Sequence, residues 1–227
     1  MEIIPGIYAI NTHRLGRAYL YREADKLTLI DTGLTGRSAD VSAAIEQVGR
    51  VEDVRQVIIT HWHVDHTGSL AEVAERSGAQ VLVHTLDAPI VRGERAGPGP
   101  QGAWRYLGPL FERVGKPALP TRVDRELSDG DEIDLDGGAR ILHVPGHTAG
   151  SIAVYVPGRR LLFAGDAMAN VFGLRPPIGV LTEDKVQARA SIRKLAELDF
   201  DIACFGHGRP LDRDASRAVR RLAERLG

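Results

Sequence analysis

The most informative stretch of the chain runs Val57-Ile58-Ile59-Thr60-His61-Trp62-His63-Val64-Asp65-His66. Its apolar first half predicts a buried strand, and its second half places three histidines and one aspartate within six residues. Packing alone does not explain these polar groups, because each would lose its water at the end of a buried strand without an obvious partner. A divalent metal supplies that partner, so the stretch predicts a metal site.

The spacing of these groups indicates two adjacent metals. In extended backbone His61 and His63 point the same way, and a turn after Val64 would bring Asp65 and His66 to a neighbouring direction. Neither pair completes a site, because a catalytic zinc takes about three protein ligands and a water. Further histidines or aspartates must therefore come from elsewhere in the chain.

Three more polar residues stand in similar surroundings, each after an apolar run and next to glycine. They are His147 in Pro145-Gly146-His147-Thr148, Asp166 in Phe163-Ala164-Gly165-Asp166, and His207 in Phe205-Gly206-His207-Gly208. Glycine allows the backbone to turn tightly, which brings the neighbouring side chain to the end of a strand.

On these motifs the chain resembles the metallo-β-lactamase superfamily of binuclear metallohydrolases. The match begins at Leu29-Ile30-Asp31-Thr32-Gly33 and ends at Gly206-His207-Gly208, so it covers nearly the whole chain. The resemblance implies an α/β fold, the αββα four-layer sandwich of the metallo-β-lactamase type. We expect residues 1–227 to form a single metallo-β-lactamase-like domain.

The resemblance also implies a set of metal ligands. These would be His61, His63 and His147 for the first metal, Asp65, His66 and His207 for the second, and Asp166 as a bridge between them. A carboxylate can bridge two ions, whereas a histidine normally binds one. Because imidazole with carboxylate disfavours calcium and magnesium, we expect two Zn²⁺ per chain, with iron or manganese as alternatives.

The expected activity is hydrolysis of a small ester, lactone or thioester through a metal-bridging hydroxide, since two nearby metals make a bound water more acidic. Asp65 would bind the second metal, orient this nucleophile and act as the catalytic carboxylate. Asp166 argues against the true β-lactamases, which lack this bridging carboxylate. Two other classes stay open: a mononuclear iron persulfide dioxygenase of the same fold, and a catalytically silent binding module.

Other residues are expected to support the metals or contact substrate. Asp31 would orient a ligand by a hydrogen bond, or else stabilise a turn. His84 would contact substrate or support the site, or else make a hydrogen bond at a helix start. Two apolar connections, 88–122 and 167–181, would line a substrate pocket or bury a dimer interface. Their candidate substrate contacts are Trp104, Tyr106 and Phe172.

Composition fits an enzyme for small molecules. The chain has 227 residues, 43% hydrophobic content and a formal net charge of −1, which gives no electrostatic reason to expect nucleic acid or an anionic membrane as partner. Cys204 is the sole cysteine, so no disulfide forms within the chain. The first residues, 1–6, show no basic region followed by a long apolar stretch, and no apolar run in the sequence reaches about 20 residues. We expect cytoplasmic residence, a small-molecule substrate and, as an open alternative to the pocket, a homodimer.

Hydrophobic periodicity predicts alternating strands and helices. The expected strands span 2–10, 17–22, 26–31, 54–60, 79–84, 139–145, 151–156, 160–165 and 200–205. The expected helices span 38–49, 67–77, 183–198 and 213–226.

Overall fold

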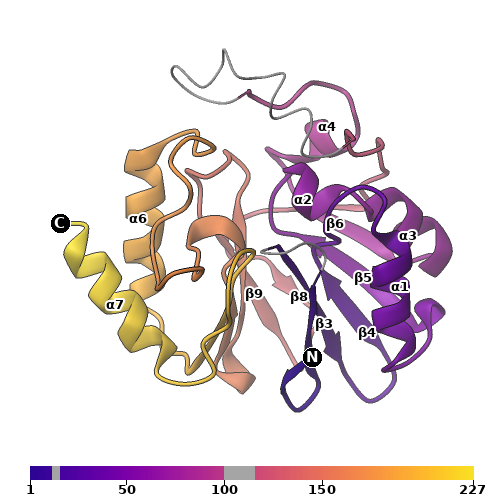
Figure 1. Cartoon of the computed structure of the whole chain (residues 1–227), viewed down its shortest axis with the longest axis horizontal. Coiled ribbons are helices and arrows are strands. Elements are labelled where there is room, and N and C mark those ends of the chain that lie inside the picture. The colour runs from indigo at the N-terminus through magenta and orange to yellow at the C-terminus, as the bar shows by residue number, and fades with distance from the viewer. Residues whose placement is uncertain (12–15, 100–115) are drawn as a thin grey trace. The chain divides into compact units, whose positions relative to one another are not determined.

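A computed structural model describes residues 1–11, 16–99 and 116–227 of the chain (Figure 1). The chain divides into two compact units. Within the described residues, unit 1 contains 1–11, 16–97 and 116–126, and unit 2 contains 98–99 and 127–227. Each unit has its own sheet and its own helices, and the single domain expected over residues 1–227 stays a prediction.

Unit 1 is built on a seven-stranded sheet whose strands follow one another in chain order. The strands are β1 (Glu2–Ile4), β2 (Ile7–Asn11), β3 (Arg17–Arg22), β4 (Leu27–Ile30), β5 (Val54–Ile59), β6 (Gln80–His84) and β7 (Arg125–Leu127). Strands β1 to β4 pair antiparallel, whereas β4, β5 and β6 pair parallel. Parallel neighbours need a crossover connection, and each crossover here contains a helix. Helix α1 (Ser38–Glu46) connects β4 to β5, and α3 (Leu70–Ser77) connects β5 to β6.

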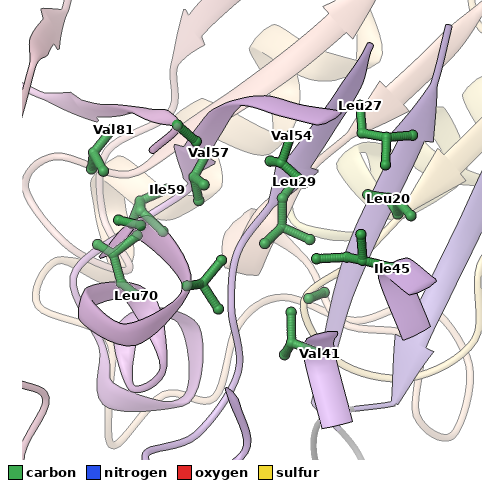
Figure 2. Close-up of a cluster of buried hydrophobic side chains, with 14 of the residues drawn as sticks. Leu20, Leu27, Leu29, Val41, Ile45, Val54, Val57, Ile59, Leu70 and Val81 are labelled. Atoms are coloured by element: carbon green, nitrogen blue, oxygen red, sulfur yellow. The ribbon is translucent and has the colours of Figure 1, made fainter. Parts of the chain in front are cut away.

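The core of unit 1 lies between this sheet and the two crossover helices (Figure 2). Leu29 and Val57 from the sheet are buried in one cluster with Ile45 of α1 and Leu70 of α3. These four side chains carry no polar atoms, so their packing fixes the strand ends without a cost in unpaired hydrogen bonds. Strand β5, from which the histidine-rich stretch emerges, is therefore held by apolar packing against both helices.

Truncation in this core should be costly. Leu29 is fully buried, so Leu29→Ala should lower the free energy of unfolding by about 2–5 kcal/mol, through lost burial and the cavity left behind. Urea denaturation checks this. Val186→Ala is the matched control, because that side chain is 78% exposed, and it should change stability by no more than about 0.5 kcal/mol. Equal effects of the two substitutions would contradict the packing described here.

Unit 2 is built on a five-stranded sheet in the order β12-β11-β10-β9-β8. The strands are β8 (Glu132–Ile133), β9 (Ala139–His143), β10 (Ile152–Val156), β11 (Leu161–Phe163) and β12 (Ile202–Cys204). Helices α6 (Lys185–Ala196) and α7 (Ala215–Arg225) pack together against this sheet (Figure 1). Helix α6 begins at Asp184, whose carboxylate accepts hydrogen bonds from the backbone N–H groups of Gln187 and Val186, and these bonds lower the pKa of Asp184.

Arg160, in the connection between β10 and β11, links two carboxylates that precede β12. Its guanidinium donates to Asp199 and to Asp201, each at a shortest distance of 2.7 Å. The hydrogen bonds from Arg160 hold the pKa of both carboxyl groups below the ordinary value and raise the pKa of the guanidinium. Because all three side chains are largely exposed, solvent screening limits the stabilisation.

These ion pairs predict a small pH dependence of stability. Since the folded-state pKa of both aspartates lies below the unfolded value of about 3.9, their contribution is present above about pH 4 and is lost as the pH falls through the lowered values. Arg160→Gln should therefore melt about 1–2 °C below the unchanged chain at pH 7. The difference should shrink as the pH falls below about 4 and through the lowered pKa values. A difference in melting temperature that grew on acidification would contradict this sign.

The mixed α/β fold with two sheets, predicted from the sequence, is confirmed. The single strand expected over 2–10 is wrong, because a turn at Pro5-Gly6 divides it into β1 and β2. Short strands β7 and β8 and the short helices α2 (Val64–Thr67) and α4 (Ala88–Val91) were not expected. Among the described residues, no helix combines the length and the apolar character needed to cross a bilayer.

Candidate metal centre

The histidine-rich stretch of unit 1 forms a compact cluster of rings. It follows β5, and α2 begins one residue after His63. The ring centroid of His61 lies 4.8 Å from that of His63 and 4.0 Å from that of His66. The extended backbone brings the first two rings together, and the turn of α2 brings in the third. The structure thus places these predicted ligands side by side within one unit.

Asp65 lies beside this cluster at its more accessible edge. Its carboxylate oxygen Oδ2 is 3.8 Å from Nε2 of His66, and its side chain is 31% exposed. His66 by contrast is almost fully buried, with 1% of its side chain exposed. The carboxylate can therefore face both the histidines and solvent, as a group that accepts a proton from a nucleophile must.

Asp31 contacts the Nδ1 side of the His66 ring. Its oxygen Oδ2 is 2.8 Å from Nδ1 of His66 and also accepts a hydrogen bond from the Thr60 hydroxyl at 2.8 Å. Its other oxygen accepts from the Thr60 backbone N–H at 2.8 Å. A neutral imidazole that donates from Nδ1 carries its lone pair on Nε2, which is the nitrogen that faces Asp65 and could bind a metal. The contact is compatible with the orienting role predicted for Asp31, and that role stays a prediction.

Backbone contacts hold α2 close to the end of β4. The backbone N–H and the hydroxyl of Thr32 both donate to the carbonyl oxygen of His66, at 2.7 and 2.8 Å. Gly68 then lies so close to the loop after β4 that a Cβ atom there would sit 2.1 Å from the backbone nitrogen of Thr35. Only glycine fits such a contact, because no side-chain movement relieves a clash with backbone.

Unit 2 contains a cluster of its own, centred on Asp166. One carboxylate oxygen, Oδ2, lies 3.5 Å from Nε2 of His147 and 3.2 Å from Nε2 of His207. His147 and Asp166 are buried, at 2% and 8% exposure, and His207 is 15% exposed. A single carboxylate thus faces two imidazoles that come from different parts of the chain.

The strand ends of unit 2 explain how these three residues meet. Asp166 lies in a 3-10 helix, Gly165–Ala167, after β11, and His207 follows the neighbouring parallel strand β12. The two loops are joined by a hydrogen bond of 2.9 Å from the Gly206 N–H to the Gly165 carbonyl. Gly146, before His147, has a φ of 129° and packs against the backbone of Ala188 in α6, where a Cβ would lie 2.2 Å from the nitrogen. The glycines predicted to allow tight turns therefore also allow close packing.

Comparison with known proteins places the chain in a family. The family model of the metallo-beta-lactamase superfamily matches residues 11–207. The chain belongs to this superfamily. The probable metallo-hydrolase YflN of Bacillus subtilis is 30% identical over 247 residues, covering 99% of this chain and 92% of that protein. A hydroxyacylglutathione hydrolase of Halorhodospira halophila is 34% identical over 155 residues, which cover 66% of this chain and 46% of that protein.

Solved structures share the fold of this chain. The metallo-beta-lactamase family protein TTHA1429 from Thermus thermophilus superposes with a TM-score of 0.73 at 25% identity, over 99% of this chain and 79% of that chain. A beta-lactamase from Chitinophaga pinensis superposes with a TM-score of 0.73 at 21% identity, over 100% of this chain and 90% of that chain, and its likeness concerns the fold alone. The resemblance inferred from the motifs, and the fold class with it, are confirmed.

The remaining predicted site residues differ in how they are placed. His84 is buried at the end of β6, where its Nδ1 accepts a hydrogen bond from the Leu86 N–H at 3.3 Å. Substrate contact or support of the site by His84, and a hydrogen bond at a helix start as the alternative, stay predictions. Phe172 is 85% exposed and belongs to the turn after Asp166. Trp104 and Tyr106 lie outside the described residues, so their roles stay predictions.

Two supporting residues were missed in the sequence. Thr60 holds Asp31 as described above, and its hydroxyl lies 3.1 Å from Nδ1 of His61. A hydroxyl residue between an apolar run and a ligand is a usable signal for such a role. Asp87 is buried, and its carboxylate accepts a hydrogen bond of 3.0 Å from the Trp62 N–H. Nothing local in the sequence marks Asp87, because its partner is 25 residues away.

Proposed function

We propose that the chain is a binuclear metal-dependent hydrolase that cleaves a small carboxylic ester, lactone or thioester. The observation that carries this proposal is the position of Asp166. One of its carboxylate oxygens, Oδ2, faces the Nε2 atoms of both His147 and His207. A carboxylate between two imidazoles is the arrangement needed for a bridge between two metals, each of which takes one of the imidazoles. Membership of a superfamily that contains metallo-hydrolases supports the same proposal.

The donor atoms fit the metals expected from the sequence. The two clusters together offer five imidazoles and two carboxylates, and no thiolate is among them. Imidazole suits zinc, iron and other transition metals, while calcium and magnesium prefer oxygen ligands alone. We propose that His61, His63 and His147 hold one zinc, that Asp65, His66 and His207 hold the other, and that Asp166 is shared. Iron or manganese would fit the same donors.

Bound metals would supply Lewis acidity and a water acidic enough to act as a nucleophile near neutral pH. The residues of the chain have separate roles around them. Asp31 keeps the imidazole of His66 in the tautomer that presents Nε2. Asp65 is placed to orient the nucleophile and to accept its proton, because its carboxylate lies beside His66 and is partly exposed.

Membership of the superfamily does not determine which type of bond is cleaved. A panel of substrates tests it: an acyl lactone, a thioester, an aryl ester and a phosphodiester, each assayed with the metal-loaded chain before and after chelation. We expect hydrolysis of at least one of the three carboxylic substrates, lost on chelation and restored by zinc. Hydrolysis of the phosphodiester alone, or oxygen consumption with a persulfide, would overturn the proposal.

The net charge of the chain bears on which partners it binds. We propose a small-molecule substrate, because the chain's near-neutral net charge of −1 gives no field that would gather polyanions. Absence of nucleic-acid partners, cytoplasmic residence and a monomer or homodimer state remain predictions. Filter binding to RNA and sedimentation velocity measure the first and the last of these directly.

A further inference from the structure

We propose that unit 2 carries a binding site for a small amphipathic carboxylate, in a hollow between helix α7 and the turn formed by residues 169–175. The hollow has a volume of about 610 Å³, which is within the range of sites for small organic ligands. None of the predicted metal ligands lines it. The inference therefore does not depend on the proposed metals, although Phe172, predicted above as a substrate contact, lines the hollow.

The floor of the hollow is apolar. Leu174 of the turn, Leu211 in the segment before α7, and Leu222 of α7 contribute to its lining. At its mouth lies Phe172, a large aromatic side chain that is 85% exposed. An aromatic ring left in water beside an apolar hollow gains hydrophobic burial as soon as an apolar ligand covers it.

The rim of the hollow is positively charged. Arg175 of the turn and Arg221 and Arg225 of α7 line it. The two arginines of α7 are one helical turn apart on the same face, a spacing at which like charges repel. Within the described part of the chain, none of the three guanidinium groups forms an ion pair with a carboxylate. A negatively charged ligand would offset this repulsion. We therefore infer that the ligand is an anion.

The walls of the hollow are held in place by hydrogen bonds. Ala169 and Arg175 pair through both backbone hydrogen bonds at 3.0 Å, which closes the turn. Arg225 donates across the hollow to the Leu174 carbonyl at 3.3 Å. At the base of the turn, the Asn170 side chain donates to the Arg209 carbonyl at 2.7 Å. Hydrogen bonds thus hold the backbone that carries the guanidinium groups. Binding would therefore cost little conformational entropy.

The combination of floor and rim selects the class of ligand. A guanidinium group matches the two oxygens of a carboxylate in a planar, bidentate contact. An inorganic anion would satisfy the rim but leave the floor in water, and a neutral hydrocarbon would fill the floor but leave the charges unmatched. A carboxylate with an apolar body, such as a medium-length fatty acid or an aromatic acid, satisfies both.

Isothermal titration of the full chain with octanoate tests the site. We expect saturable binding that weakens with added salt, and at least about 10-fold weaker binding by the double variant Arg175→Gln, Arg221→Gln. Ala218→Phe should block the hollow without changing any charge, because Ala218 lines it. The matched control is Arg217→Gln, also on α7 but outside the lining, which should bind within about 2-fold of the unchanged chain.

Several results would overturn the site. Sulfate or acetate binding as tightly as octanoate would mean that the apolar floor contributes nothing, and octanol binding as tightly would mean the same of the arginines. Equal weakening by Arg217→Gln would reduce the effect to overall charge. A dimer that Ala218→Phe dissociates, without octanoate binding, would assign this face to a second copy of the chain. No saturable binding at all would also reject the proposal.

Discussion

Replacing Asp166 with alanine should leave the chain unable to retain either metal and should lower kcat/KM for the best substrate by on the order of 10³-fold or more. The reason is that its carboxylate faces the imidazoles of both His147 and His207, so one substitution removes a ligand from both proposed metals. Metal content after gel filtration, measured by mass spectrometry, and steady-state rates check the two parts separately. Asp65→Ala should instead lose mainly one metal.

The control for Asp166→Ala is Asp212→Ala, which removes an exposed carboxylate of unit 2 and should change neither metal content nor rate. Asp166→Asn separates size from charge, because an amide fills the same space without the negative charge that a bridge provides. Retention of both metals by Asp166→Ala would contradict the bridging role. Loss of metals by Asp212→Ala would show that the assay reports general instability instead.

Asp31→Asn should weaken metal binding by about 10–100-fold while the fold is kept. Asparagine tolerates the positive φ of 60° at this position, and its oxygen can still accept from the Thr60 N–H. Its NH₂ group would face Nδ1 of His66, however, and two donors cannot bond to each other. The imidazole would then favour the tautomer whose lone pair is on Nδ1, away from the proposed metal.

Competition with a chromogenic chelator measures this loss of affinity, and urea denaturation of the metal-free chain measures any loss of fold. Asp124→Asn is the matched control, since that carboxylate accepts from the Val81 N–H in the same unit and contacts none of the proposed ligands. Unchanged metal affinity in Asp31→Asn would show that its hydrogen bond does not orient His66. An equal loss in Asp124→Asn would point to a general effect of removing a carboxylate charge.

The parts of the site that could be predicted from sequence are those fixed by local geometry. His61, His63 and His66 meet because they lie within six residues at the end of an apolar strand, where alternation and a turn leave few other arrangements. The glycines next to Asp166 and His207 marked tight turns in the same way. Local chemistry and local geometry therefore agree at these positions.

The parts that could not be predicted depend on contacts between distant residues. Helix α2 has four residues, too few for a hydrophobic period to be recognised. Asp31 was expected either to orient a ligand or to stabilise a turn, and its contact with His66, 35 residues away, could not be predicted from the local sequence. The hollow beside α7 likewise forms where Arg225 meets Leu174 across 51 residues of sequence. No spacing rule connects such positions.

The most direct test of the two-metal proposal is the metal content of the purified chain, measured by inductively coupled plasma mass spectrometry together with protein concentration from amino-acid analysis. We expect about two equivalents of zinc, or of iron or manganese, per chain, because the two clusters offer ligands for two sites. A single equivalent of iron that persists after incubation with excess zinc, or no bound metal at all, would contradict the binuclear site.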